Sequence, residues 1–218
     1  MKFAIIVFPG SNCDYDAFYA LKNIGYDVEF VWHQNTSLNS FDGILIPGGF
    51  SYGDYLRTGA IAKFSPVMKS IIEESKKGKV IIGICNGFQI LTESGLLPGS
   101  LINNNNIKFI SKEVTLNIKS SNSIFTKNIN IKKIKMPIAH KEGNYIANDD
   151  ILQELRDRDQ ILFEYDNNPN GSMLNIAGIV NKKRNVLGMM PHPERATDVL
   201  LGSDDGKLIF ESILENYA

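Results

Sequence analysis

Cys85 stands in the sequence pattern that most directly indicates chemistry. Residues 80–89 read Val-Ile-Ile-Gly-Ile-Cys-Asn-Gly-Phe-Gln, which predicts a buried strand running into a helix, with a glycine two residues to either side of the cysteine. This is the nucleophile-elbow pattern, in which the turn is so tight that flanking side chains would collide with neighbouring elements. The helix N-terminus favours the thiolate over the thiol. A free cysteine is commonly a buried structural residue, but the two glycines favour a catalytic nucleophile.

His192 is the best candidate for the general base. It lies in the run Met-Pro-His-Pro-Glu at 190–194, after a predicted strand, and each residue that precedes a proline is driven away from helix toward extended conformations. Residues two apart in an extended chain face the same way. The Glu194 carboxylate could therefore bond one imidazole nitrogen and leave the other free for Cys85, which completes a triad of nucleophile, base and orienting group. The alternative is a proline-rich surface turn with an incidental histidine.

The other two histidines carry weaker signals. His33 follows Trp32 at the end of a predicted strand, and we interpret it as structural. His140 lies in the run Pro-Ile-Ala-His-Lys-Glu-Gly at 137–143. That run leaves open whether His140 belongs to a structural turn or faces a substrate or a partner.

A tetrahedral intermediate at Cys85 would need backbone N–H donors. The residue after the nucleophile, Asn86, supplies one of them naturally. The second would come from the turn that follows strand 44–46, which leaves open whether Gly48, Gly49 or Phe50 donates it. The next residues also contain glycine but lack the Gly-Lys-Ser/Thr of a phosphate loop, so nucleotide binding is not expected there.

Short β-branched runs and helix-period stretches alternate along the first half of the chain. Strands are predicted at 3–8, 28–32, 43–46 and 80–84, and helices at 15–24, 61–77 and 87–94. This alternation predicts an α/β fold with a doubly wound, mostly parallel sheet and helices on both faces. Ligands in such folds bind beyond the carboxyl ends of the strands, where Cys85 and His192 are expected.

The pattern changes after Pro98-Gly99. The polar tract 103–106 and the short alternating runs 114–118 and 129–134, with few helical signals, predict an antiparallel insertion. Strands are predicted to resume at 161–165, 174–180 and 186–190, and a closing helix is predicted at 207–217.

Composition excludes several classes of protein. With Lys+Arg 23 against Asp+Glu 24 and a net charge of -1, the 218 residues carry no strong field for nucleic acid or an anionic membrane. The first apolar run, 3–8, is too short for a signal peptide, and no later run reaches membrane-spanning length, so we expect a cytoplasmic protein.

The two cysteines, Cys13 and Cys85, are too few for a disulfide framework and lack the paired spacing of a zinc site. We expect two free thiols and no bound metal.

Motifs along nearly the whole chain resemble the class I (triad) glutamine amidotransferases. The elbow and the His-Pro-Glu run mark that superfamily. Two further motifs, Gly-Phe-Ser-Tyr-Gly-Asp at 49–54 and Cys-Asn-Gly-Phe-Gln at 85–89, are similar to the branch formed by the glutaminase subunits of phosphoribosylformylglycinamidine synthase. The runs at 8–14, 137–140 and 188–195 agree with that branch. Lys141 departs from it, since the family pattern there resembles His-Gly-Glu-Gly.

The resemblance implies a complete reaction. Residues 1–218 would form a single glutamine amidotransferase domain in which Gln89 helps to hold glutamine and Cys85 forms a glutamyl thioester. Water activated by His192 would then release glutamate. The ammonia would pass to a synthetase subunit that converts formylglycinamide ribonucleotide to its amidine with ATP. No cofactor is expected in this chain: ATP and Mg²⁺ would bind the synthetase, and a small accessory subunit would complete the assembly.

Three alternatives remain open at the level of the sequence. The chain could be the glutaminase subunit of another amidotransferase, or a cysteine peptidase or deglycase-like hydrolase that uses the same elbow. It could also be a binding or regulatory module with a degenerate site. The His-Pro-Glu run argues against the hydrolases, and the presence of every required group argues against the inactive module.

Overall fold

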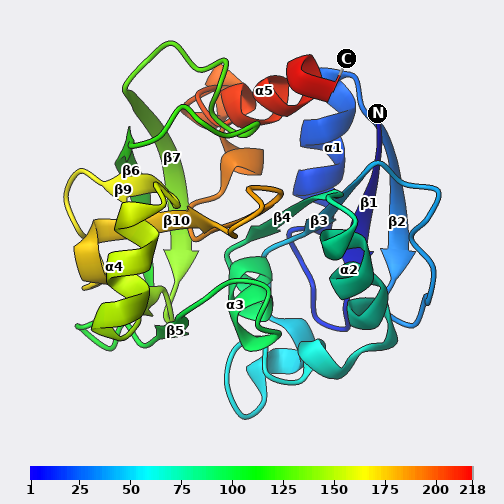
Figure 1. Ribbon diagram of the computed structural model, residues 1–218, viewed down its shortest axis with the longest axis horizontal. Helices are drawn as coiled ribbons and strands as arrows, with labels where there is room; N and C mark the ends of the chain where they lie inside the picture. The colour runs from blue at the N-terminus through cyan, green and yellow to red at the C-terminus, as the bar shows by residue number, and fades with distance from the viewer. Residues whose placement is uncertain (218) are drawn as a thin grey trace.

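Parallel strands build the half of the sheet that carries the elbow. The computed structural model describes residues 1–217. Five strands pair in parallel in the order β2-β1-β3-β4-β11 (Figure 1). Their bounds are β1 (Lys2–Val7), β2 (Asp27–Trp32), β3 (Gly43–Ile46), β4 (Val80–Ile84) and β11 (Val186–Met189). β3, β4 and β11 are buried throughout, as expected for strands covered on both faces.

Four helices cover the parallel strands. They are α1 (Asp14–Ile24), α2 (Pro66–Lys76), α3 (Asn86–Glu93) and α5 (Lys207–Tyr217). The chain moves from β1 to β2 in one direction across the sheet and from β3 to β4 in the other, so right-handed crossovers place α1 and α2 on opposite faces. Figure 1 shows α1 beside α5 and, across strands β3 and β4, helices α2 and α3. The predicted doubly wound fold is confirmed.

The predicted antiparallel insertion is also present, and it extends the same sheet. Beyond β11 the order continues β10-β9-β6-β7, with every neighbouring pair antiparallel. These strands are β10 (Ile176–Val180), β9 (Ile161–Tyr165), β6 (Ile110–Ile118) and β7 (Lys133–His140), and a separate two-stranded sheet joins β5 (Ser100–Ile102) to β8 (Asn144–Ile146). The sheet therefore passes without interruption from the elbow to β7.

Some predicted boundaries were wrong for identifiable reasons. The helix predicted at 61–77 is broken, because Ser65 precedes Pro66 and adopts φ -62 and ψ 143, so a short 3-10 turn (Ala62–Phe64) ends before α2 begins. The strand predicted at 129–134 begins only at Lys133, and the one predicted at 174–180 begins at Ile176 after a 3-10 turn.

Helix α4 (Asp149–Asp157) was missed altogether. Its N-terminal signal is present in the sequence. The Asn148 side chain accepts the Ile151 N–H at 2.9 Å, and Asp149 and Asp150 occupy the first turn, where the helix dipole favours acidic groups.

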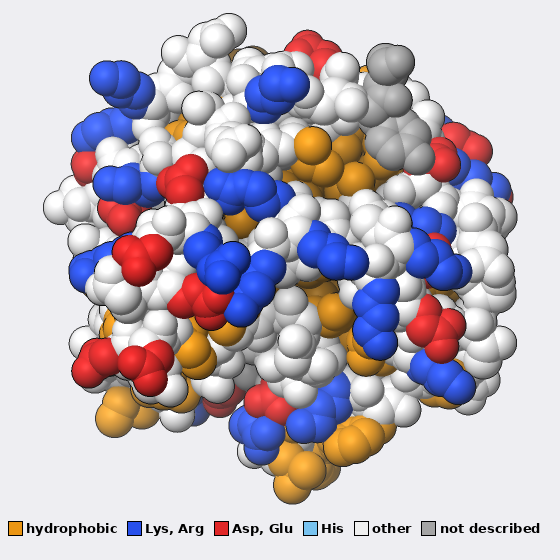
Figure 2. All heavy atoms as spheres, in the orientation of Figure 1, with side chains coloured by type: hydrophobic (Ala, Val, Ile, Leu, Met, Phe, Trp, Pro, Cys, Tyr) orange, Lys and Arg blue, Asp and Glu red, His pale blue; other side chains and the backbone are white. Residues whose placement is uncertain are grey.

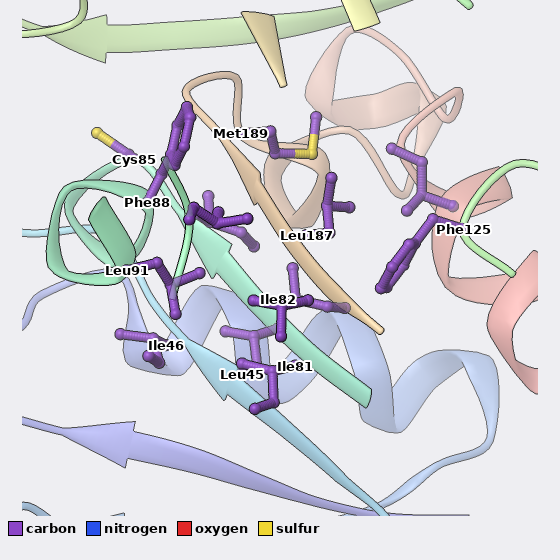
Figure 3. Close-up of a cluster of buried hydrophobic side chains, with 14 of the residues drawn as sticks. Leu45, Ile46, Ile81, Ile82, Cys85, Phe88, Leu91, Phe125, Leu187 and Met189 are labelled. Carbon is purple, nitrogen blue, oxygen red and sulfur yellow. The ribbon is translucent and has the colours of Figure 1, made fainter. Parts of the chain in front are cut away.

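A continuous apolar core surrounds the elbow. The cluster includes Ile81 and Ile82 of β4, Leu187 of β11, and Phe88 and Leu91 of α3, and all five side chains are fully buried (Figure 3). Figure 3 also shows Cys85 at the edge of this cluster, with its sulfur directed away from the apolar side chains. The core thus fixes the backbone of the elbow while leaving the thiol outside it.

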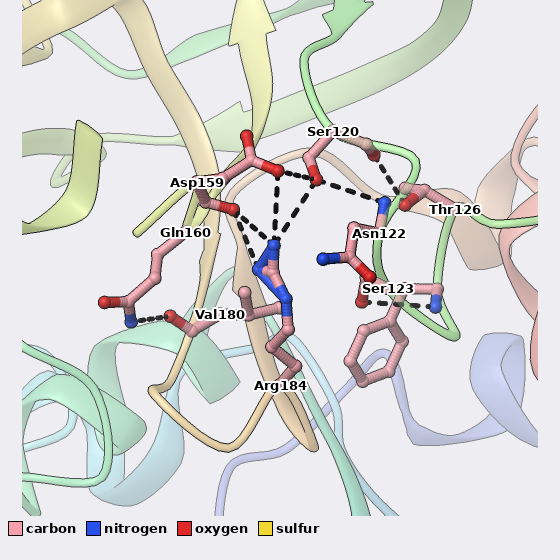
Figure 4. Close-up of polar contacts among 9 residues, drawn as sticks. Ser120, Asn122, Ser123, Thr126, Asp159, Gln160, Val180 and Arg184 are labelled. Atoms are coloured by element: carbon pink, nitrogen blue, oxygen red, sulfur yellow. Dashed lines mark hydrogen bonds and ion pairs between the residues drawn. The ribbon is translucent and has the colours of Figure 1, made fainter. Parts of the chain in front are cut away.

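A polar cluster ties the insertion to the hairpin that leads into β11. The Arg184 guanidinium donates to the Asp159 backbone carbonyl at 2.8 and 2.9 Å and to the Asp159 carboxylate at 3.3 Å (Figure 4). The Ser120 hydroxyl donates to the same carboxylate. These contacts join the turns before β9 and β11 to the segment after β6.

The surface carries charges of both signs. Figure 2 shows Lys and Arg side chains interspersed with Asp and Glu, without a field of one sign on the visible face. Among residues 1–217, no helix combines the length and apolar character that crossing a bilayer requires.

The packing around the elbow predicts a sharp intolerance at Gly87. A Cβ there would lie 2.0 Å from the Ile46 carbonyl oxygen, so Gly87→Ala should lower the free energy of unfolding by about 3 kcal/mol through overpacking. Gly95→Ala is the matched control. It has φ +72 and nothing within 4 Å, so only the left-handed conformation is penalised, by about 1 kcal/mol. Denaturant unfolding of both variants measures the difference, and equal losses would contradict a crowded elbow.

Candidate active site

Cys85 has the strained backbone of a nucleophile elbow. It is the N-cap residue of α3 with φ 51 and ψ -105, a conformation that side-chain-bearing residues rarely adopt. Its N–H donates to the Met189 carbonyl at 2.8 Å, which anchors the turn to β11. The residue is 5% exposed, and its sulfur lies 3.7 Å from the Ala139 carbonyl oxygen, to which the thiol can donate.

His192 and Glu194 form the predicted pair, although by a different backbone route. A 3-10 turn, Pro193–Arg195, starts immediately after His192, so the extended conformation expected through Glu194 was wrong. The turn nevertheless brings the Glu194 Oε1 to 2.6 Å from the His192 Nδ1. Because a carboxylate only accepts, Nδ1 carries the hydrogen and Nε2 is left with its lone pair when the ring is neutral.

The charge on His192 depends on its acidic neighbours. Burial by itself lowers the pKa of this imidazole, but the Glu194 carboxylate and the Cys85 sulfur outweigh burial and raise the pKa to about 10. Both members of the pair are almost wholly inaccessible, at 1% and 3% exposed. The imidazole can therefore hold a proton well above neutral pH.

Gly48 brings the nucleophile and the base together. A Cβ added there would lie 2.8 Å from the His192 Cε1, 3.2 Å from the Cys13 Sγ and 3.4 Å from the Cys85 Cβ. Only a glycine lets these three side chains meet at one point. They line a cavity of about 130 Å³, together with Phe50 and other residues. This volume is small beside the roughly 300–1,000 Å³ of sites for larger ligands, and it suits one end of an amino acid.

Of the candidate oxyanion donors, Gly49 and Phe50 line this cavity. Asn86 is the first residue of α3, so the helix itself gives its N–H no partner. The Phe50 N–H is already bonded to the Gly10 carbonyl at 3.1 Å, which leaves Gly48 and Gly49 as candidates for the second donor. The Asn86 side chain accepts the Ser51 N–H at 3.1 Å and so ties the two loops together.

Strand β7 supplies a support for the site that was not predicted. The Pro137 carbonyl accepts the His192 N–H at 2.9 Å, and the Ala139 carbonyl lies against the Cys85 sulfur. Backbone carbonyls belong to every residue, so side-chain types carried no signal for these contacts. One strand of the insertion thereby touches both the nucleophile and the base.

Gln89 is placed one turn below the nucleophile and is held by the loop that follows β7. Its side-chain amide donates to the Glu142 carbonyl at 2.6 Å and accepts from the Asn86 side chain at 3.0 Å. The Glu142 carboxylate accepts the Thr58 hydroxyl at 2.7 Å, which connects this loop to the segment after Gly49. Contact of Gln89 with substrate stays a prediction.

His140 is buried and held by Asn104. Asn104 donates its side-chain NH₂ to the His140 carbonyl at 2.9 Å, so its oxygen accepts from the His140 Nδ1 at 3.1 Å. Burial, and then the charge of His192, lower the pKa of His140 to about 4, which keeps the ring neutral. Lys141, the departure from the family pattern, is exposed and has no positive φ, so a side chain fits there without strain.

His33 has the structural role expected of it. Its Nδ1 lies 2.9 Å from the Tyr52 hydroxyl, and its ring packs against Trp32 and Phe8. Burial lowers the pKa of this ring.

Comparison with known proteins shows the family of the chain. Residues 1–205 match the model of the CobB/CobQ-like glutamine amidotransferase domain. The structure of PurLQS from Thermotoga maritima is 43% identical over 100% of this chain and 99% of that chain, with a TM-score of 0.93.

Two more distant structures share the fold. A GMP synthase subunit from Thermoplasma acidophilum is 18% identical with a TM-score of 0.69, over 99% of this chain and 93% of that chain. A glutamine amidotransferase from Thermotoga maritima is also 18% identical, with a TM-score of 0.58 over 99% of this chain and 90% of that chain.

The electrostatics of the pair predict the behaviour of Glu194→Gln. Removing the carboxylate charge takes away the largest interaction that raises this pKa, so the pKa of His192 should fall from about 10. NMR titration of the imidazole resonances measures this shift. His33 is the internal control, because burial alone lowers its pKa and the substitution should leave it in place. A His192 that still titrates near pH 10 in the variant would contradict the assigned cause.

The same shift has a consequence for stability. Because the pKa of His192 is raised on folding, its contribution to the free energy of unfolding is present below about pH 6.5 and is lost as pH rises toward about 10. In the Glu194→Gln variant, the free energy of unfolding should fall less as pH rises from about 6.5 to about 10, because the pKa of His192 is no longer raised by the carboxylate.

Proposed function

Because this chain belongs to the family of CobB/CobQ-like glutamine amidotransferases, we propose that it hydrolyses glutamine at Cys85 and supplies the ammonia to a synthetase subunit. That subunit would use ATP to convert formylglycinamide ribonucleotide to formylglycinamidine ribonucleotide, a step of purine biosynthesis. One observation carries the catalytic assignment. The His192 ring is fixed through Nδ1 by Glu194, while the ring and Cys85 both reach the open face of Gly48.

The first half of the reaction is an acyl transfer. The Cys85 thiol gives its proton to His192, and the sulfur attacks the side-chain amide carbon of glutamine to form a carbon–sulfur bond while the carbonyl oxygen becomes an oxyanion. The Asn86 N–H and a donor at Gly48 or Gly49 stabilise that oxyanion, and each such donor is worth about 3 kcal/mol in comparable enzymes. Protonated His192 gives its proton to the amide nitrogen, the carbon–nitrogen bond breaks, and ammonia leaves a glutamyl thioester.

The second half is hydrolysis of the thioester. His192, now neutral, takes a proton from water as the oxygen attacks the thioester carbon, and the carbon–sulfur bond breaks to give glutamate. Glu194 holds the ring in the orientation both steps need and stabilises its charged form. Both side chains are almost wholly buried, which limits contact of the imidazole with bulk water.

The assignment to a particular amidotransferase rests on two supports. The chain matches PurLQS from Thermotoga maritima over nearly the full length of both chains, at 43% identity. The motifs 49–54 and 85–89 are similar to those of glutaminase subunits of phosphoribosylformylglycinamidine synthase. We therefore place ATP and Mg²⁺ on a separate synthetase subunit and expect a small accessory subunit in the complex.

A diazo-ketone analogue of glutamine tests the nucleophile. It should label Cys85 at one equivalent and leave Cys13 unmodified, since Cys85 lies directly before the Asn86 N–H, whereas burial and the Glu194 carboxylate raise the pKa of Cys13 to about 12 and keep its thiol protonated. Peptide mass spectrometry locates the label, and Cys13 is the control within the same molecule. His192→Ala should slow labelling and glutamine hydrolysis by about 10²- to 10⁴-fold. Full hydrolysis with an unlabelled Cys85 would refute the assignment.

Nitrogen transfer tests the partner. With purified synthetase and accessory subunits, amide-labelled glutamine should yield labelled amidine, and Cys85→Ser should abolish that product. Free ammonia should still support amidine formation with the variant, because the synthetase site is intact. The rate of glutamine hydrolysis should also rise when the partners are added, since ammonia made without an acceptor is wasted. Equal rates with and without the partners would argue against coupling.

A further inference from the structure

A second thiol, Cys13, lies in the cavity of the proposed nucleophile. It is the N-cap residue of α1, is 4% exposed, and lines the same cavity as Cys85 and His192. The Arg195 guanidinium donates to its sulfur from Nη2 at 3.1 Å. The proposed steps of glutamine hydrolysis do not use this sulfur, so its position beside the base is not accounted for by that reaction.

Cys13 belongs to a compact set of metal-binding side chains. Its Sγ, one nitrogen of His192 and one carboxylate oxygen of Glu194 lie within 4.8 Å of one another, and all three residues are buried. Two side-chain atoms of these residues, His192 Nε2 and Glu194 Oε2, are buried without a hydrogen-bond partner among the described residues. We propose that Cys13, His192 and Glu194 form a site for a thiophilic divalent cation such as Zn²⁺.

The ligand types select the class of ion. Thiolate, imidazole and carboxylate are the groups that bind zinc in proteins, whereas Mg²⁺ and Ca²⁺ prefer oxygen ligands alone. A tetrahedral zinc ion holds its ligand atoms roughly 3.3 to 3.7 Å apart. The three ligand atoms lie within 4.8 Å of one another, and side-chain rotations that move each atom by roughly 1 Å bring them to that spacing.

Coordination also changes the protonation of the ligands. Burial and the Glu194 charge raise the pKa of the Cys13 thiol to about 12, so the free protein holds a neutral thiol there. A bound metal ion deprotonates a coordinating thiol outright, and the ion replaces the protons on Cys13 and His192. An ion bound at the His192 Nε2 occupies the lone pair that this nitrogen needs in order to accept a proton.

The charges around the site fit a divalent cation. Arg195 contributes one positive charge, and Asp16 accepts its Nε–H at 2.9 Å. With the Glu194 carboxylate and a Cys13 thiolate, the cluster carries two net negative charges, which a divalent ion neutralises. The cavity of about 130 Å³, which Cys13, His192 and Arg195 all line, gives the ion a way in.

The consequence for activity rests on the proposed function. An ion held by His192 and Glu194 removes the base and the orienting carboxylate together, so glutamine hydrolysis stops until the ion leaves. The site differs from simple binding of a metal ion to the Cys85 sulfur, because Cys13 supplies a separate thiolate ligand close to His192 and Glu194.

Cobalt titration of the intact chain tests the site without relying on turnover. Co²⁺ should give thiolate-to-cobalt charge-transfer absorption and the visible bands of a tetrahedral centre, saturating at one equivalent, and Zn²⁺ should displace it. Cys13→Ser should weaken binding at least about tenfold, and Glu194→Gln should also weaken it. Cys85→Ser is the matched control at the neighbouring thiol. Binding that survives in it supports a site built on Cys13.

Two results would overturn the proposal: wild-type protein without thiolate-to-cobalt absorption, or full binding in Cys13→Ser. Thermal unfolding of each variant shows that it is folded before binding is compared. Zn²⁺ at buffered free concentrations should inhibit glutamine hydrolysis, a chelator should restore it, and Cys13→Ser should need at least about tenfold more Zn²⁺ relative to its own metal-free rate. Labelling of Cys85 by the diazo-ketone in metal-free protein is independent of these outcomes, so either hypothesis can fail alone.

Discussion

The parallel pairing of β4 with β11 is the constraint on which the site depends. Ile84 and Met189 are partners in that ladder, and the Cys85 N–H continues it by donating to the Met189 carbonyl at 2.8 Å. The two strands therefore end at the same level of the sheet. Cys85 follows one strand directly and His192 follows the other after a short turn, so residues more than 100 positions apart in the sequence face one cavity. Backbone hydrogen bonds between the two strands thus help to bring Cys85 and His192 to the same cavity.

Close approach of backbones is the second requirement, and glycines meet it. Cys85 keeps a φ of 51 because β4 and α3 press together at Gly83 and Gly87, where any Cβ would strike neighbouring atoms. The absence of a Cβ at Gly48 likewise leaves room for the Cys85 and His192 side chains to approach each other. The same crowding that strains the elbow holds the thiol in place, so packing energy from the surrounding core maintains a conformation that the cysteine would not adopt alone.

The sequence predicted the parts of the site that depend on side-chain type and missed those that depend on the backbone. β-branched runs marked β3 and β4, and the glycines around Cys85 marked the elbow. The His192–Glu194 contact was predicted, but the 3-10 turn that makes it was not, because the rule for residues preceding proline does not fix the residues after it. The support from Pro137 and Ala139 could not be predicted, since carbonyl groups are common to all residues and only the register of β7 places them.

The two thiols show why a helix N-terminus does not by itself make a reactive cysteine. Both are N-cap residues, Cys13 of α1 and Cys85 of α3, and the dipole argument applies equally to each. Yet burial and the nearby Glu194 carboxylate raise the pKa of Cys13 to about 12 despite the adjacent Arg195 guanidinium. Desolvation and one buried carboxylate therefore keep this thiol protonated at a helix N-terminus. Cys85 differs in its place on the strained turn, directly before Asn86, whose N–H has no partner within the helix.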